Sequence, residues 1–352
     1  MKNAAVGIAV IGYGGMGGYH AEHLLKMDKF DLKGVYDIRE CQLQNARDKG
    51  IRAYTSLEEL LADPEIELVT IATPNDVHKP IAIQAMRAGK NVISEKPVTL
   101  SSEDLEEMIA VSEQEKKLFT VHQNRRWDDD YLTVKNVIDT NLLGPVFRIE
   151  SRVQGSRGIP SGWRREKEHG GGMVLDWGVH LLDQALTLCD RDRLISVYAS
   201  ITNITNKECD DGFYSELKFA SGLMFSVEVT TNNFFELPRW YVLGVNGTAV
   251  LEDWGRKPHA VLVHNWDKND AAPVQLGTGI SMTMAPRTDD TIKDIPLEKA
   301  NGDWSQYYDN IYDVLRRGAE QIVTHRQMRR STRLMEMIFE SAAKNEVIHC
   351  DI

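Results

Sequence analysis

The chain has little cysteine, no long apolar run and a deficit of positive charge, and each shortage excludes a class of protein. Its four cysteines, Cys41, Cys189, Cys209 and Cys350, are far apart and form no CxxC pair, so neither a disulfide framework nor a zinc site is indicated. No stretch approaches the ~20 apolar residues that cross a bilayer. With 41 Lys and Arg against 52 Asp and Glu, the net charge of -11 argues against nucleic acid or an anionic membrane as main partner. We therefore expect a cytoplasmic protein with reduced thiols and no bound metal.

The composition otherwise suits a globular protein with a full hydrophobic core. At 352 residues, with 42% hydrophobic and 26% charged residues, the chain is long enough for two domains. Residues 1–124 alternate short β-branched runs with amphipathic stretches, which is typical of βαβ units in a doubly wound parallel sheet. The expected strands are Val6–Ile11, Leu32–Tyr36, Leu68–Ile71, Val92–Ser94 and Leu118–Val121. Helix starts are expected where a capping box occurs, at Ser56 with Glu59 and at Ser101 with Asp104.

The pattern changes in residues 125–352, which we expect to form a second, α+β domain. The expected elements are a helix at Tyr131–Thr140, a strand at Val146–Val153, successive strands within 195–252, and helices at about 304–317 and 327–343. Hairpin turns are expected at Ser221-Gly222 and at Asn246-Gly247. Residues 255–302 are polar and weakly periodic, and no element is assigned to them.

A glycine-rich loop joins the first strand to the first helix. In VIGYGGMGGYH, Gly12, Gly14 and Gly17 have the GxGxxG spacing that provides a tight turn, close approach to a pyrophosphate and close helix–strand packing. The helix N-terminus that follows offers free N–H groups to phosphates. Asp37 ends the second strand, where its carboxylate can bind ribose hydroxyls. These features predict a bound dinucleotide, and Asp37 favours NAD over NADP even though the neighbouring Arg39 can bind a 2′-phosphate.

Two further motifs carry candidate chemistry. NVISEKPVTLS places Glu95 and Lys96 at the carboxyl end of a strand, where ligands bind in open α/β sheets. The alternative is an exposed turn lysine paired with Glu95. GGGMVLDWGVHLLDQ contains Asp176 and His180, which share one face if the segment is helical, with Gly178 leaving room for a substrate or nicotinamide. The alternative here is a buried histidine that bonds the aspartate for packing reasons.

The other histidines and the segment before the glycines have ordinary interpretations. A metal site at Asp176 and His180 lacks a third ligand at useful spacing. The pairs His20/His23 and His259/His264 are expected to face solvent or to bond locally. RREKE, after Trp163, is by default a solvated loop.

Together these motifs resemble the Gfo/Idh/MocA family, the relatives of glucose–fructose oxidoreductase and inositol dehydrogenase. The resemblance covers essentially the whole chain, through GYGGMG, TPNDVH, EKP, HQNRRWDDDYLT and GGGMVLDWGVHLLDQ in the family's order. It implies an N-terminal Rossmann domain and a second domain with an open, mostly antiparallel sheet. It also implies a homodimer or homotetramer, because family members commonly associate through the exposed sheet face.

The resemblance further implies which residues act on each ligand. The catalytic residues would be Lys96, Asp176 and His180. The cofactor-binding residues would be Gly12, Tyr13, Gly14, Gly15, Met16, Gly17, Asp37, Ile38, Arg39, Thr73, Pro74, Asn75, His78, Glu95 and Lys96. The substrate-binding residues would be Lys96, Asn124, Arg126, Trp163, Arg164, Asp176 and His180. His180 would be the general base in alcohol oxidation, with a pKa close to working pH, while Asp176 orients it and Lys96 stabilises the alkoxide.

The implied activity is hydride transfer between NAD, with NADP also possible, and a secondary hydroxyl or ketone of a sugar, cyclitol or glycoside. One alternative is an NADPH-dependent carbonyl reductase that works in the opposite direction. Another is a non-catalytic dinucleotide-binding regulator, since the same fold serves both purposes. The presence of Lys96, Asp176 and His180 together favours an enzyme, because a pure sensor would be free to lose them.

Overall fold

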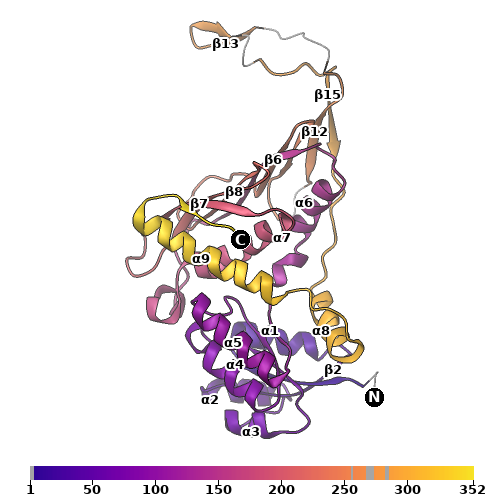
Figure 1. The fold of residues 1–352 in the computed structure, drawn as a ribbon, viewed down its shortest axis with the longest axis vertical. Helices are drawn as coiled ribbons and strands as arrows, with labels where there is room; N and C mark the ends of the chain where they lie inside the picture. The colour runs from indigo at the N-terminus through magenta and orange to yellow at the C-terminus, as the bar shows by residue number, and fades with distance from the viewer. Residues whose placement is uncertain (1–3, 255–256, 267–272, 282–284) are drawn as a thin grey trace.

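Two large sheets organise the chain in the computed structural model, which describes residues 4–254, 257–266, 273–281 and 285–352 (Figure 1). The first is a five-stranded parallel sheet in the order β2-β1-β3-β4-β5. Its elements are β1 Val6–Ile11, α1 Gly15–Leu24, β2 Phe30–Tyr36, α2 Glu40–Asp48, α3 Leu57–Ala62, β3 Leu68–Ile71, α4 His78–Arg87, β4 Asn91–Ser94, α5 Ser102–Glu115 and β5 Phe119–Val121. All five predicted strands and the doubly wound parallel sheet are thus confirmed.

The apolar runs of this sheet follow from burial on both faces. Every residue of β1, β3 and β5 is buried, which is why these strands read as continuous hydrophobic runs in the sequence. The two predicted helix starts are also confirmed, because the Ser56 and Ser101 hydroxyls each accept a hydrogen bond from the backbone N–H three residues later. The strand order reverses at β1 and β3, and their carboxyl ends mark the position where open α/β sheets bind ligands.

The second sheet has nine strands in the order β15-β12-β11-β10-β6-β9-β8-β7-β16. Only β6 and β9 pair in parallel among these neighbours, so the sheet is mostly antiparallel, as predicted. The elements of this half are α6 Asp129–Asp139, β6 Val146–Gln154, α7 Val179–Leu188, β7 Leu194–Thr202, β8 Gly212–Phe219, β9 Met224–Thr230, β10 Trp240–Gly244, β11 Gly247–Leu251, β12 His259–Val263, β13 Val274–Leu276, β14 Gly279–Ser281, β15 Ile292–Pro296, α8 Ser305–Arg317, α9 His325–Lys344 and β16 Ile348–His349.

One of the two predicted hairpins has its turn in a different place. The β8–β9 turn contains Gly222 at φ 95°, as expected. In the β10–β11 hairpin, however, Gly244 pairs with Gly247, so Val245 and Asn246 form the loop and Gly247 belongs to the strand. A Cβ on Gly247 would lie 2.5 Å from the Val261 carbonyl oxygen. Close approach of the neighbouring β12 therefore explains this glycine, rather than the turn.

The last helices return the chain to the first domain. Tyr307, Tyr308, Ile311 and Tyr312 of α8 join the hydrophobic core of the parallel sheet, and Figure 1 shows α8 beside the N-terminal domain. α9 packs on β7, α7 and α5, so it contacts both domains. A boundary at residue 124 remains a prediction.

The unassigned region 255–302 contributes strands to the second half. Its described residues form β12 and β15 at the edge of the nine-stranded sheet. β13 and β14 form a separate two-stranded sheet, and Figure 1 shows β13 projecting away from the main body. Residues 255–256, 267–272 and 282–284 lie outside the described residues. Among the described helices none has the length and apolar character needed to cross a membrane.

Candidate active site

An ion pair between Lys96 and Asp176 joins the two domains at the candidate active site. Lys96 follows β4, and its Nζ donates to the backbone carbonyl of Asp176 at 2.9 Å and to Asp176 Oδ1 at 3.3 Å. Arg164 Nε donates to the other carboxylate oxygen at 3.1 Å. Burial alone would raise the pKa of Asp176, but Lys96 and Arg164 outweigh it and keep this pKa below its usual value. The carboxylate is therefore ionised and fixed between two cations.

Asp176 lies in a turn of π-helix rather than in an α-helix. Val174–Gly178 form the π-helix and α7 follows directly. No hydrogen bond joins the side chains of Asp176 and His180, both of which the structure describes, so the expectation that Asp176 orients His180 is not supported. Asp176 instead accepts from Lys96 and Arg164, while the His180 ring packs near Trp177.

His180 is deeply buried beside this ion pair. It is 5% exposed, its Nδ1 is buried without a hydrogen-bond partner, and its ring centre lies 6.2 Å from that of Trp177. Burial, then the positive charges of Lys96 and Arg125, hold the pKa of His180 well below its usual value. This differs from the predicted pKa near working pH. A neutral imidazole at neutral pH is the form that accepts a proton.

Of the two neighbouring arginines, the one that faces the site is Arg125. Arg126 is 6% exposed and forms a bidentate pair with Asp183, at 2.7 and 2.6 Å. Its remaining Nη1 donates to Gln327 Oε1, so the guanidinium is committed to structure and does not support the predicted substrate role. Arg125, by contrast, stacks 4.3 Å above the ring of Trp177 and contributes to the field at His180.

Glu95 lies in a buried hydrogen-bonded cluster instead of pairing with the Lys96 ammonium. Its Oε1 accepts hydrogen bonds of 2.8 Å from both His20 and His122, and its Oε2 accepts from the Lys96 backbone N–H. Burial disfavours ionisation, but the two imidazoles outweigh it and hold the pKa of Glu95 well below its usual range. The exposed-turn interpretation of Lys96 is therefore wrong. His20 is fully buried and bonds Glu95 and Tyr308, which are distant in sequence, so the expectation that it faces solvent or bonds locally is wrong.

This cluster could in principle hold a metal ion, since its three ligand atoms lie within 4.8 Å of one another. The shared Glu95 oxygen already accepts from both rings, and Tyr308 OH lies 2.6 Å from the other His20 nitrogen. Hydrogen bonding thus accounts for the polar atoms that these residues bring together. The side chain of Glu95 is buried and supports the position of Lys96 through the hydrogen bond from the Lys96 N–H.

The glycine loop has the shape that a dinucleotide requires. Gly12 has φ 89°, and a Cβ there would lie 2.5 Å from the Ala72 carbonyl oxygen. A Cβ on Gly17 would lie 1.8 Å from the Gly12 carbonyl oxygen, so α1 packs against the loop only because this residue is glycine. Gly15, at the start of α1, has open space on its Cβ side. The first amides of α1 have no partner within the helix and can donate to a pyrophosphate.

Asp37 lies where the ribose of such a dinucleotide would pass. Its Oδ2 accepts from the Tyr13 backbone N–H at 2.8 Å, and its Oδ1 accepts from the Arg39 N–H at 2.9 Å and from Arg39 Nε at 3.2 Å. Asp37 is buried, whereas Ile38 is 88% exposed and could cover an adenine ring. The Tyr13 side chain packs in the core, so only its backbone serves the loop.

The predicted loop Thr73–Asn75 reaches the second domain. Asn75 Nδ2 donates to the Gly170 carbonyl oxygen at 2.9 Å, and Thr73 Oγ1 is buried without a partner. His78 instead joins two loops through its ring, which bonds the carbonyls of Thr73 and Pro97. This favours a structural role for His78.

Aromatic rings and guanidinium groups contact one another near Asp176. Arg164 stacks 4.6 Å from the ring centre of Trp163. Trp254, which sequence reasoning missed, lies 6.0 Å from Trp177 and 5.5 Å from the Arg125 guanidinium. No local pattern marks Trp254, because the sheet alone brings it to Trp177. Asn124 is buried at the domain junction.

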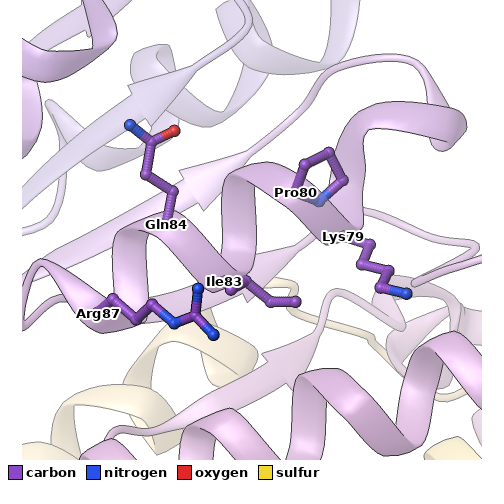
Figure 2. Close-up of a pocket in the computed structure, with 5 residues that line it drawn as sticks. All are labelled: Lys79, Pro80, Ile83, Gln84 and Arg87. Carbon is purple, nitrogen blue, oxygen red and sulfur yellow. The ribbon is translucent and has the colours of Figure 1, made fainter.

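One cavity among the described residues lies away from this site. It has a volume of about 470 Å³ and is lined by five residues of α4, Lys79, Pro80, Ile83, Gln84 and Arg87. Figure 2 shows their side chains. Lys79 is paired with Asp104 and Glu107. None of the five residues forms an acid–base pair with another, so the site is located by the chemistry around Lys96 and Asp176.

Comparison with known proteins agrees with this arrangement. The sequence model described as an oxidoreductase family with an NAD-binding Rossmann fold matches residues 6–123, and the GFO/IDH/MocA C-terminal domain matches residues 131–250. Fold and site thus define a two-domain, dinucleotide-binding oxidoreductase. The chain belongs to the Gfo/Idh/MocA family, and the predicted nicotinamide cofactor is confirmed at this level.

Several relatives are similar over the whole chain. A crystal structure of an NAD-binding protein from Listeria innocua is 42% identical, covers 98% of this chain and 99% of its own, and has a TM-score of 0.95. The scyllo-inositol 2-dehydrogenase (NADP(+)) IolW of Bacillus subtilis is 26% identical over 99% of this chain and 96% of its own. An uncharacterised oxidoreductase of Schizosaccharomyces pombe is 42% identical, but the match spans 46% of this chain and 45% of that protein.

Proposed function

We propose that this protein is an NAD-dependent dehydrogenase that oxidises a secondary hydroxyl group of a sugar, cyclitol or glycoside. The observation that carries the proposal is the Lys96–Asp176 ion pair across the domain junction, with the buried His180 beside it. Three groups that handle charge and protons therefore meet near the edge of the dinucleotide-binding sheet.

The residues divide the chemical work among them. Bound nicotinamide supplies the hydride acceptor. Neutral His180 accepts the hydroxyl proton on a ring nitrogen, and burial keeps the imidazole neutral for this task. Lys96 Nζ donates a hydrogen bond to the same substrate oxygen and stabilises its negative charge as the carbonyl forms. Asp176 fixes Lys96 and Arg164, so both cations are in place before the substrate binds.

The walls of the site support a polyhydroxylated substrate. Trp163 and Trp254 offer flat apolar faces, and Arg164 and Arg125 beside them offer hydrogen-bond donors. Sugars and cyclitols combine an apolar ring face with hydroxyls at its edge. The relatives named as inositol dehydrogenases support the same class of substrate.

Two alternatives remain distinguishable by experiment. The same groups can catalyse the reverse reaction, in which protonated His180 donates the proton and reduced nicotinamide donates the hydride. With NADPH as the hydride donor, the protein would be an NADPH-dependent carbonyl reductase. A non-catalytic regulator would bind dinucleotide without turnover. We also propose a cytoplasmic homodimer or homotetramer formed through the exposed sheet face, which size-exclusion chromatography with light scattering would test.

The test is a spectrophotometric screen of inositols, hexoses, pentoses and glycosides with NAD and NADP, in wild type and Lys96→Met. We expect nicotinamide reduction by wild type with at least one of these alcohols, and its loss in the variant. Lys79→Met is the matched control, because Lys79 lies on α4 in surface ion pairs. Dinucleotide binding without turnover of any alcohol or ketone would favour the regulator.

A further inference from the structure

A buried carboxylate that has not yet been given a role contacts the segment that carries Asp176 and His180. Asp210 is in the loop between β7 and β8 and is 6% exposed. Its Oδ2 accepts a hydrogen bond of 2.7 Å from the Val174 backbone N–H, and its own backbone carbonyl accepts from the Met173 N–H at 3.1 Å. Asp210 thus binds the start of the π-helix that carries Asp176 through both side chain and backbone.

The start of this helical segment needs such an acceptor. The first amides of a helix have no partner within it, and a negative charge there is favoured by the aligned peptide dipoles. A π turn has less regular hydrogen bonding than an α-helix, so an outside acceptor has more influence on where the turn is placed. Here the acceptor comes from a loop that is distant in sequence.

The space around the carboxylate is reserved for it. Gly172 has φ 109°, and a Cβ there would lie 2.1 Å from Asp210 Oδ1. The loop itself is held by Asp211, whose carboxylate accepts from the hydroxyls of Thr202 and Thr205 at 2.9 Å. Asn206 of the same loop donates to the Arg165 carbonyl oxygen at 3.2 Å. One loop therefore supports both the π-helix and the segment that carries Arg164.

We propose that Asp210 is a positioning residue for the reaction, and that its ionised carboxylate fixes the turn that places Asp176 and His180 opposite Lys96. The inference rests on the proposed function for its kinetic part only. Its structural part concerns the hydrogen bond to Val174 and can be measured on protein without substrate.

The Asp210 carboxylate is ionised at neutral pH, although its burial and the nearby Asp211 disfavour the negative charge. Burial raises the pKa of Asp210 to about 6, although its hydrogen bonds from Val174 and Met173 lower it, and repulsion from Asp211 raises it further. The amides of the π-helix face the Asp210 carboxylate, and Asp211, in the same loop as Asp210, is the charged group beside it. Because the folded-state pKa is raised, the native protein binds this proton more tightly than the unfolded chain. The free energy of unfolding of wild type therefore decreases as the pH rises toward about 6. Above that pH the whole decrease is present.

The experiment compares wild type with Asp210→Asn, which preserves the shape of the side chain and removes the charge, and with Asp28→Asn, an exposed control. We expect Asp210→Asn to lower kcat roughly 10- to 100-fold, because small misplacements of reacting groups have effects of this size. KM for the dinucleotide should change less than about two-fold. The Tm of the variant should match or exceed that of wild type at pH 8, and the difference should shrink as the pH falls below 6.

Hydrogen exchange at the Val174 amide provides the readout that needs no activity. We expect faster exchange in Asp210→Asn and no change in Asp28→Asn. An unchanged kcat, or a kcat loss that merely accompanies a lower Tm at every pH, would overturn the positioning role. If wild type itself oxidises no substrate, the proposed function fails, while the exchange and Tm measurements still decide whether Asp210 fixes this turn.

Discussion

Lys96 Nζ lies 2.9 Å from the backbone carbonyl oxygen of Asp176 and 3.3 Å from its Oδ1, although the two residues are 80 positions apart. Lys96 comes from the end of a strand in the parallel sheet, whereas Asp176 comes from the π-helix of the second domain. The contact therefore exists only when the two domains are packed together. A change that loosens the domain junction would thus separate the ammonium group from the carboxylate that orients it.

Lys96→Met should reduce turnover roughly 10²- to 10⁴-fold, the usual effect of removing a positioned acid–base or electrostatic group. The Kd for dinucleotide should stay nearly constant, since the glycine loop and Asp37 are untouched. Steady-state kinetics and fluorescence titration measure the two quantities separately. Near-full turnover by Lys96→Met, with Lys79→Met as control, would show that Lys96 has no role in the chemistry.

The pH profile should report the ionisation of His180. Protonated His180 cannot accept the substrate proton, so kcat/KM for oxidation should rise with pH as the ring loses its proton. Because the pKa is held well below 6.5, this rise should be complete before neutral pH. His180→Asn should lower the rate and flatten this limb. An acid limb that is identical in the variant would assign the ionisation to another group.

The parallel sheet could be predicted almost residue by residue, because strands covered on both faces are continuous apolar runs. The errors occurred where a distant element decides a local structure. Gly247 serves close packing by β12, which the Asn-Gly pattern does not reveal. The π turn at Asp176 is hydrogen-bonded to Asp210 and Lys96, and neither is a neighbour in sequence.

The two arginines show the same limit at the site. Arg125 and Arg126 are adjacent and carry the same charge. Asp128, three residues on, pairs with Arg125, but nothing in the sequence indicates which arginine pairs with the distant Asp183. Asp183 decides it by accepting a bidentate pair from Arg126. Burial likewise moves the pKa of His180 away from its usual value, and burial depends on the assembled domains.

The different partners of the two arginines lead to a prediction about stability. Arg126→Ala would leave Asp183 buried and unpaired, and removing one partner of a buried pair costs about 3–5 kcal/mol. Arg125 also forms an ion pair, with Asp128, but its side chain is 23% exposed against 5% for Arg126, so Arg125→Ala should lower the free energy of unfolding less and should raise KM for substrate. Urea denaturation and steady-state kinetics measure the two effects. A stability loss in Arg125→Ala as large as that in Arg126→Ala would contradict this division.

The preference for NAD depends on a small cluster at the end of β2. The Asp37 carboxylate accepts from the Tyr13 N–H and pairs with Arg39. The Arg39 Nη2 lies 3.6 Å from where a Cβ added to Gly14 would be, so the guanidinium is beside the glycine loop. A dinucleotide ribose passes at this point. A 2′-phosphate would meet the buried carboxylate, and repulsion between like charges disfavours it. Arg39 cannot offset this repulsion fully while its own charge is paired with Asp37.

Asp37→Ser should therefore shift the ratio of kcat/KM for NAD over NADP toward NADP. We expect a shift of roughly 10-fold or more, which corresponds to about 1.4 kcal/mol. The substitution removes the repulsion and also releases Arg39, whose guanidinium can then pair with the phosphate. The double variant Asp37→Ser/Arg39→Ala separates these two effects, because it should lose most of the gain with NADP while retaining the weaker binding of NAD. The measurement is kcat/KM for each cofactor at saturating substrate. If wild type prefers NADP, or if Asp37→Ser leaves the ratio unchanged, then Asp37 does not select the cofactor.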